Sequence, residues 1–133
     1  MNYEFKKPIV LISAERPNIT EVGNYKRTLD LRQDLINGDF GFKVVNGHYK
    51  GRSEISYAVV CLNNEALEEL ISLSDKYGQD CILYRDENDN ARLESLTGTE
   101  YLGKMVQATE YTATESDNYT YDPTTGGYYV VRP

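Results

Sequence analysis

The sequence is poor in the residues that most metal and redox centres use. Its 133 residues include no tryptophan, one histidine (His48) and two cysteines (Cys61 and Cys81). A structural zinc site takes four Cys or His ligands, so this supply predicts no zinc centre. Each cysteine lies inside an apolar stretch, which predicts two small buried side chains rather than a redox pair or a disulfide.

The sequence also lacks the segments that mark membranes, secretion or nucleotide cofactors. No apolar run approaches the roughly 20 residues that a transmembrane helix needs. Residues 1–7 are polar and charged, unlike a secretory signal. The glycines do not have the spacing of a phosphate-binding loop. We therefore expect a cytoplasmic protein with no cofactor and no membrane partner.

Positive charge is scarce in the second part of the chain. The net charge is −7, with +3 on residues 1–52 and −10 on residues 53–133. Such a surface repels phosphate backbones, so we expect no direct nucleic-acid binding. It can instead meet a basic protein partner, or only confer solubility.

The hydrophobic pattern predicts an α/β (α+β) fold in the first two thirds of the chain. A β-α-β-β-α-β order through residue 85 is typical of the ferredoxin-like split βαβ sandwich. Asn46-Gly47 marks either a tight hairpin turn or a bulge in one strand. The expected strands are 9–12, 41–50, 54–62 and 81–85, with an edge strand at 91–96, and the expected helices are 20–37 and 64–77.

The first predicted helix, 20–37, carries its own start and stop signals. Thr20 is a plausible N-cap, and Gly38 can end the helix in a left-handed conformation. Its apolar residues indicate a face that packs on the sheet. That face consists of Val22, Tyr25, Leu29 and Ile36, with Leu31 and Leu35 beside it.

The last third of the chain differs in composition. Residues 97–133 hold six of the twelve tyrosines and little aliphatic content, so we divide the chain into a core domain at 1–96 and a Tyr-rich acidic extension at 97–133. The turn signal Asp122–Gly127 predicts a hairpin of 119–121 with 128–131. The alternative is a mobile tail that becomes ordered on a partner. The candidate contact residues are Tyr119, Tyr121, Tyr128 and Tyr129.

Four polar residues are candidates for a ligand site. Glu54 and Ser56 are two apart on a predicted strand, so their side chains lie on one face about 7 Å apart. Gln79 follows the second helix, and Asn24 lies early in the first, where asparagine is a poor helix former. Their side chains either satisfy nearby backbone groups or converge on a site. His48 is more consistent with an exposed residue than with a catalytic base.

The same polar residues carry a family resemblance. In order and spacing, the segments Ser13–Pro17, Asn24, Glu54–Tyr57 and Tyr77–Asp80 resemble a small family of uncharacterised bacterial and phage proteins, over residues 9–85. That resemblance implies an α/β fold and a bacterial or phage origin. It implies no reaction.

These observations favour binding over catalysis. We expect an accessory protein, encoded by a phage or mobile element and located in the host cytoplasm, that engages or inhibits a host or viral protein. One alternative is a small enzyme or ligand-binding domain with a polar site at Asn24, Glu54, Ser56 and Gln79. Others are an acidic nucleic-acid mimic and a structural component of a virion. The oligomeric state stays open.

Overall fold

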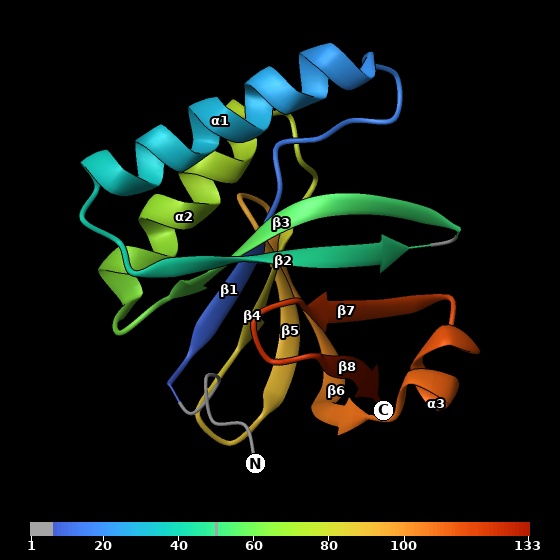
Figure 1. Cartoon of the computed structure of the whole chain (residues 1–133). Helices are drawn as coiled ribbons and strands as arrows, with labels where there is room; N and C mark the ends of the chain where they lie inside the picture. Colours follow the sequence, from blue (N-terminus) through green and yellow to red (C-terminus); the bar gives the residue numbers. More distant parts are fainter. Residues whose placement is uncertain (1–6, 50) are drawn as a thin grey trace.

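Eight antiparallel strands form a closed barrel in the computed structural model, which describes residues 7–49 and 51–133 (Figure 1). Two longer helices lie side by side against one wall of the barrel, and a short third helix lies near its C-terminal strands. The strands are β1 (Ile9–Ile12), β2 (Phe42–Tyr49), β3 (Arg52–Val60), β4 (Ile82–Arg85), β5 (Asn90–Ser95), β6 (Gly98–Ala108), β7 (Asn118–Asp122) and β8 (Gly127–Arg132). The helices are α1 (Glu21–Asn37), α2 (Asn64–Lys76) and α3 (Glu110–Thr114).

The predicted ferredoxin-like sandwich is wrong. The chain does begin with the order β-α-β-β-α-β, but the order around the sheet is β1-β3-β2-β7-β8-β6-β5-β4, and β4 returns to β1. The expected edge strand pairs on both sides, because β5 joins β4 to β6. On the other side β7 pairs with β2. Closure leaves neither β2 nor β4 as an open edge, and this removes the cost of unpaired backbone groups there.

The C-terminal residues supply three strands of this barrel. The predicted hairpin is present as β7 and β8, with Tyr121 opposite Tyr128 and Asp122 opposite Gly127. β8 then pairs with β6 from Lys104 to Ala108. Residues 98–132 therefore help to enclose the interior of the barrel, which we call the lumen.

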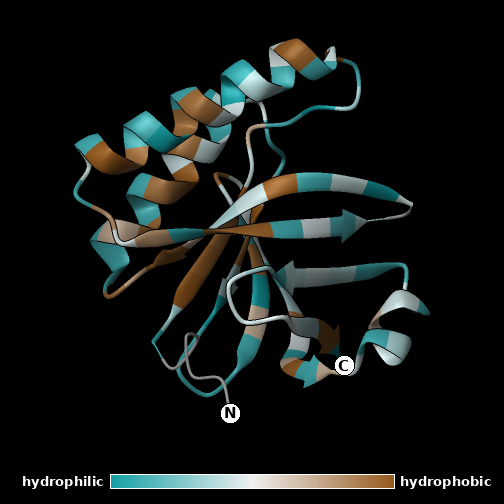
Figure 2. Ribbon diagram, viewed as in Figure 1, coloured by the Kyte–Doolittle hydropathy of each residue, from teal (hydrophilic) through white to brown (hydrophobic). Residues whose placement is uncertain are grey.

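The main hydrophobic core lies outside the barrel, under α1 and α2. Side chains alternate along a strand, so Val10 and Ile12 of β1 face the helices while Ile9 and Leu11 face the lumen. Leu31, Leu35 and Leu70 meet this wall from the helices, and all three are fully buried. Each such side chain contributes about 1.5–3 kcal/mol by burial. Figure 2 shows the continuous hydrophobic colour of β1 beneath the helices.

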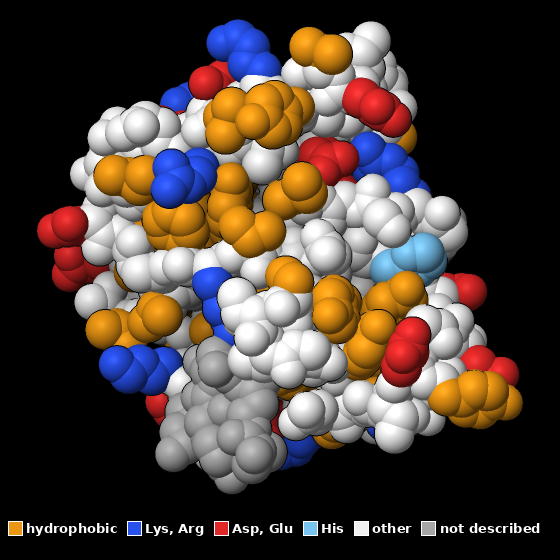
Figure 3. Space-filling view, in the orientation of Figure 1, with side chains coloured by type: hydrophobic (Ala, Val, Ile, Leu, Met, Phe, Trp, Pro, Cys, Tyr) orange, Lys and Arg blue, Asp and Glu red, His pale blue; other side chains and the backbone are white. Residues whose placement is uncertain are grey.

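Helix α1 begins where the sequence predicts, but a different face is buried. The Thr20 hydroxyl accepts a hydrogen bond from Gly23 N at 3.1 Å, as an N-cap does. The predicted apolar face is wrong: Val22 and Tyr25 are 80% and 63% exposed, and Leu29 and Ile36 are exposed as well. Figure 3 shows the hydrophobic side chains on the outer side of this helix. The buried residues are Asn24, Thr28, Leu31 and Leu35.

One detail of the helix ends differs from expectation. Gly38 has φ −84°, and the left-handed residue after α1 is Asp39, with φ 65°. After α2, Gly78 has φ +71°, and a Cβ there would lie 2.6 Å from Arg16 Nη1. The Arg16 side chain is flexible and can move away, so it is the left-handed backbone conformation that favours glycine at 78.

The cysteines are free. Cys61 is buried and Cys81 is half-buried, so the disulfide alternative is excluded, and burial raises the pKa of both thiols. None of the helices in residues 7–49 and 51–133 is long and apolar enough to cross a membrane.

Apolar side chains and a buried ion pair fill one end of the lumen. Ile9, Val45 and Ala58 pack there. Asp122 is completely buried, and it accepts hydrogen bonds from Lys43 and from the backbone and hydroxyl of Thr124. Burial alone would raise the pKa of Asp122, but these hydrogen bonds hold it below the ordinary value. This end of the lumen is therefore closed by charge pairing as well as by packing.

Replacing Asp122 with alanine is expected to lower the free energy of unfolding by at least about 3 kcal/mol. The substitution removes the buried carboxylate that accepts hydrogen bonds from Lys43 and Thr124, and breaking one half of a buried ion pair costs about 3–5 kcal/mol. Because the pKa of Asp122 is lower in the folded state, its contribution is present above the unfolded-state pKa and is lost as pH falls through the folded-state value. Urea unfolding at neutral and acidic pH measures both effects.

Asp30→Ala is the control for this experiment. Asp30 pairs with Lys26 on the surface of α1, where both side chains are more than half exposed, at 54% and 77%. Exposed pairs contribute about 0–1 kcal/mol, so this variant is expected to unfold almost as the wild type does. Equal losses in the two variants would contradict a structural role for the Asp122 pair.

Candidate functional site

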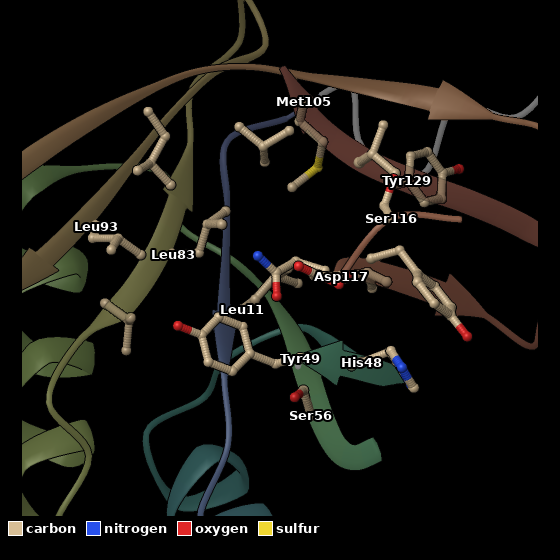
Figure 4. A pocket seen from close by; sticks show the side chains of 18 of the residues that line it. Leu11, His48, Tyr49, Ser56, Leu83, Leu93, Met105, Ser116, Asp117 and Tyr129 are labelled. Carbon is tan, nitrogen blue, oxygen red and sulfur yellow. The ribbon is translucent and has the colours of Figure 1, made fainter. Parts of the chain in front are cut away.

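A cavity of about 740 Å³ occupies the end of the lumen away from Asp122. Residues from all eight strands line it, and its volume lies within the roughly 300–1,000 Å³ of small-molecule sites. Figure 4 shows Leu11, Leu83, Leu93 and Met105 around one space, with Tyr129 near them. An eight-stranded barrel is just wide enough to hold one small ligand.

Small side chains in the lumen make the room for this cavity. Gly47 faces Glu54 across the β2–β3 pairing, and an added Cβ would meet Ser56 Oγ at 3.4 Å and Glu54 Cγ at 3.7 Å. The turn or bulge predicted at Asn46-Gly47 is wrong, because β2 runs through both residues in regular pairing with β3. Gly47 therefore leaves space for the cavity and does not reverse the direction of the chain.

Glu54 is the carboxylate on the polar side of the cavity. It lies on β3 between Arg52 and Ser56, and its side chain is 28% exposed. Burial raises the pKa of Glu54, and repulsion from the carboxylate of Glu15 adds to this, while attraction to Arg52 opposes it. A carboxylate with a raised pKa is a stronger proton acceptor than an ordinary surface glutamate.

The cavity lining carries more negative than positive charge. Glu54, Glu100 and Asp117 line it with one guanidinium residue, Arg132. Such a surface favours a ligand with positive charge. The described residues contain no group of three or more His, Cys, Asp or Glu side chains that could hold a metal ion.

The four polar residues predicted from the sequence do not all meet in the cavity. Glu54, Ser56 and Gln79 line it, whereas Asn24 does not. The amide of Asn24 instead holds the segment after β1: it accepts from Arg16 N and donates to Arg16 O, both at 2.9 Å. Gln79 Nε2 donates to the carbonyl of Glu15 at 3.0 Å. Asn24 and Gln79 thus position the chain next to the site.

The tyrosines of the C-terminal strands lie on two faces of the barrel wall. Tyr129 is nearly buried and lines the cavity. Tyr128, its neighbour on β8, lies on the other face, with its ring centroid 4.7 Å from that of Tyr121. Tyr119 continues this row and stacks on His48 at 4.7 Å, and both also border the cavity. The row therefore crosses β2, β7 and β8 on the outside of the barrel.

Sequence reasoning missed two charged residues beside Glu54. Arg52 Nη1 donates to Glu54 Oε2 at 3.2 Å, and Arg52 Nη2 lies 3.6 Å from Glu15 Oε1. The alternation Arg52-x-Glu54-x-Ser56 places all three side chains on one face of a strand, and this signal could have found Arg52. Glu15 follows the end of β1, and no sequence signal connects it with β3.

Replacing Glu54 with glutamine is expected to stabilise the protein at about pH 7. A pKa that is higher in the folded state means that the ionised form is disfavoured by folding. The contribution of Glu54 is thus most favourable below its unfolded-state pKa, and it is lost as pH rises through the folded-state pKa. Glutamine resembles the protonated form, so the gain should vanish near pH 3. Urea unfolding of both proteins at the two pH values tests this, and a less stable variant at pH 7 would contradict it.

Comparison with known sequences identifies a family for this arrangement. The sequence model of the S-adenosylmethionine lyase family matches residues 10–132, which include every strand of the barrel in whole or in part. A search of curated proteins finds no match.

This match corrects the function predicted from the sequence. The expected protein-binding accessory protein is wrong, since the match points to a family named for an enzyme activity, and the alternative of a small enzyme fits better. The match also gives no support to the expected phage or viral origin, and the uncharacterised family was not the right one. The chain belongs to the S-adenosylmethionine lyase family.

Proposed function

We propose that the chain binds S-adenosylmethionine in the cavity of the barrel and cleaves a carbon–sulfur bond of its sulfonium group. The observation that carries this proposal is the half-buried carboxylate of Glu54, with its raised pKa, in a ligand-sized cavity. The family name indicates the substrate and the type of reaction.

The charge of the cavity supports a substrate of this kind. S-adenosylmethionine carries a positive sulfonium and a positive ammonium against one carboxylate. Glu54, Glu100 and Asp117 line the cavity with negative charge. Opposite charges about 4 Å apart attract by about 4 kcal/mol at an effective dielectric constant near 20. The carboxylates therefore attract the substrate and hold its sulfonium in the lumen.

The chemistry needs a leaving group, a base and little water. When the carbon–sulfur bond breaks, sulfur keeps both electrons and leaves as a neutral thioether. The carbon fragment then loses a proton, or is captured by the substrate's own carboxylate. Glu54 can accept the proton in the first case, and its charge orients the sulfonium in both. Leu11, Leu83 and Leu93 form an apolar wall of the cavity, and such side chains offer water no hydrogen-bond partner.

The test is to incubate the protein with S-adenosylmethionine and to separate the products by liquid chromatography with mass spectrometry. We expect loss of substrate and formation of a thioether nucleoside. Glu54→Gln should lower kcat by at least about 100-fold, the usual contribution of a general base. The second product identifies the route, because proton loss gives an unsaturated amino acid and internal capture gives a lactone.

Glu94→Gln is the matched control. Glu94 lies on β5, where its strand partner Ile82 faces the helices, and it hydrogen-bonds Arg92 and Thr99 outside the cavity lining. Activity of this variant should equal that of the wild type. No consumption of S-adenosylmethionine by the wild-type protein would refute the proposed function. Equal activity in the two glutamate variants would refute the role of Glu54.

A further inference from the structure

The chain contains two Arg-x-Glu pairs on strands, and their surroundings differ. Arg92 and Glu94 lie on the outer wall, where Arg92 hydrogen-bonds Glu94 and its guanidinium lies 4.5 Å from the ring centroid of Tyr84. Arg52 and Glu54 lie on the inner face of β3, where Glu54 lines the cavity and Arg52 contacts Glu54 from just outside the lining; within the described residues no aromatic ring lies against Arg52. Arg92 thus contacts both a carboxylate and an aromatic ring, whereas Arg52 contacts carboxylates alone.

Arg52 has N–H donors left for another acceptor. Its two contacts with the described residues are 3.2 Å to Glu54 and 3.6 Å to Glu15, both longer than the about 2.7–2.9 Å of a good charge-assisted hydrogen bond. A guanidinium has five N–H donors in a planar fork. The side chain is 36% exposed, so a ligand can reach it.

Glu15 holds Arg52 from the side away from Glu54. The Glu15 carboxylate accepts a hydrogen bond from Ile55 N at 2.6 Å, and the Ser13 hydroxyl donates to Ile55 O at 3.0 Å. These side chains continue the pairing with β3 beyond the end of β1. With its backbone held by Gln79, Glu15 is a fixed second anion that keeps Arg52 at the rim when Glu54 engages a ligand.

An anionic cavity needs such a cation for this substrate. The carboxylate of the amino-acid end of S-adenosylmethionine is repelled by Glu54, Glu100 and Asp117. Arg132 also borders the cavity, but it alternates with Tyr129 and Val131, so its side chain belongs to the outer face of β8. Arg52 shares the inner face with Glu54 and Ser56. Within the part of the chain that the structure describes, Arg52 is thus the guanidinium that contacts the cavity carboxylate Glu54 on that face.

We propose that Arg52 binds the carboxylate of the amino-acid end of S-adenosylmethionine, with Glu15 as its positioning residue. This inference rests on the proposed function. The amino-acid end then lies at the rim, the sulfonium lies near Glu54, and the nucleoside points into the apolar part of the lumen. Arg52 selects ligands that carry a carboxylate over those that lack it.

The test compares ligands that differ in the amino-acid end. Isothermal titration calorimetry measures S-adenosylhomocysteine, which has the amino-acid end but no sulfonium, and 5′-methylthioadenosine, which has neither. Arg52→Gln should weaken the first ligand at least about tenfold, the loss expected for a hydrogen bond between charged groups. It should leave the second within about twofold. Arg52→Lys should fall between, because lysine keeps the charge but loses the fork.

Kinetics give a second, independent measurement. Decarboxylated S-adenosylmethionine keeps the sulfonium, the amine and the nucleoside. Arg52→Gln should lower kcat/KM for S-adenosylmethionine and weaken its binding, and it should leave the Kd of the decarboxylated compound nearly unchanged. Binding is measured for that compound because it has no carboxylate and cannot react by internal capture. Glu15→Gln should show the same selectivity with a smaller effect, whereas a merely structural role would affect both compounds equally. Arg92→Gln is the matched control and should change neither.

The outcomes separate the two proposals. If the wild-type protein neither binds nor cleaves any of these compounds, the proposed function fails, and the assignment of Arg52 fails with it. If the wild type is active but Arg52→Gln weakens all ligands equally, or none, only the assignment of Arg52 is overturned. Circular dichroism confirms that each variant is folded before its ligands are compared.

Discussion

The backbone pairing of β2 with β7 is the constraint on which the rest of this structure depends. Residues 46–49 pair with residues 118–121, and this ladder joins the first half of the sheet to the second. Without it β2 would be an open edge, and the side chains of the lumen would face water. With it the interior becomes a closed space whose walls come from all eight strands. The site is therefore a product of the closure and not of any single loop.

Closure alone does not make a cavity, because an eight-stranded barrel is normally filled by its own side chains. In this barrel one end of the lumen is filled by side chains and the other end is not. At one end, Ile9, Val45 and Ala58 pack against the buried pair of Lys43 and Asp122. At the other end, glycine and serine stand where larger residues would fill the space. The placement of small residues opposite Leu83, Leu93 and Met105 gives the lumen an apolar side and a polar side.

Some local signals in the sequence predicted local structure correctly. The N-cap at Thr20, the helix that ends at Asn37 and the hairpin turn at 122–127 are all present. The pairing of strands was not predictable, because hydrophobic alternation fixes which residues share a face but not which strand lies beside which. The buried face of α1 was misassigned for a related reason. Asn24 and Thr28 are buried although polar, and the amide of Asn24 is satisfied by a loop whose position the helix pattern does not contain.

The candidate site was predictable to the same limited extent. Glu54 and Ser56 share a strand face by simple alternation, and both line the cavity. The role of Glu15 could not be predicted from the sequence, because its contacts with Ile55 and Arg52 join positions about forty residues apart. The fold had to be known before a residue outside any strand could be related to β3.

The charges around Glu54 conflict with stability in a way that is typical of functional sites. Glu54 is partly buried next to a second carboxylate, and its pKa is raised, so the folded state disfavours its ionised form. Arg52 lies between the two carboxylates, 3.2 Å from Glu54 and 3.6 Å from Glu15. A sequence selected for stability alone would pair these groups fully or replace them by neutral residues. In the proposed function, the ammonium and the carboxylate of the substrate would interact with Glu54 and Arg52 respectively. The imbalance that weakens the folded barrel is thus the same feature that would give the proposed substrate its affinity.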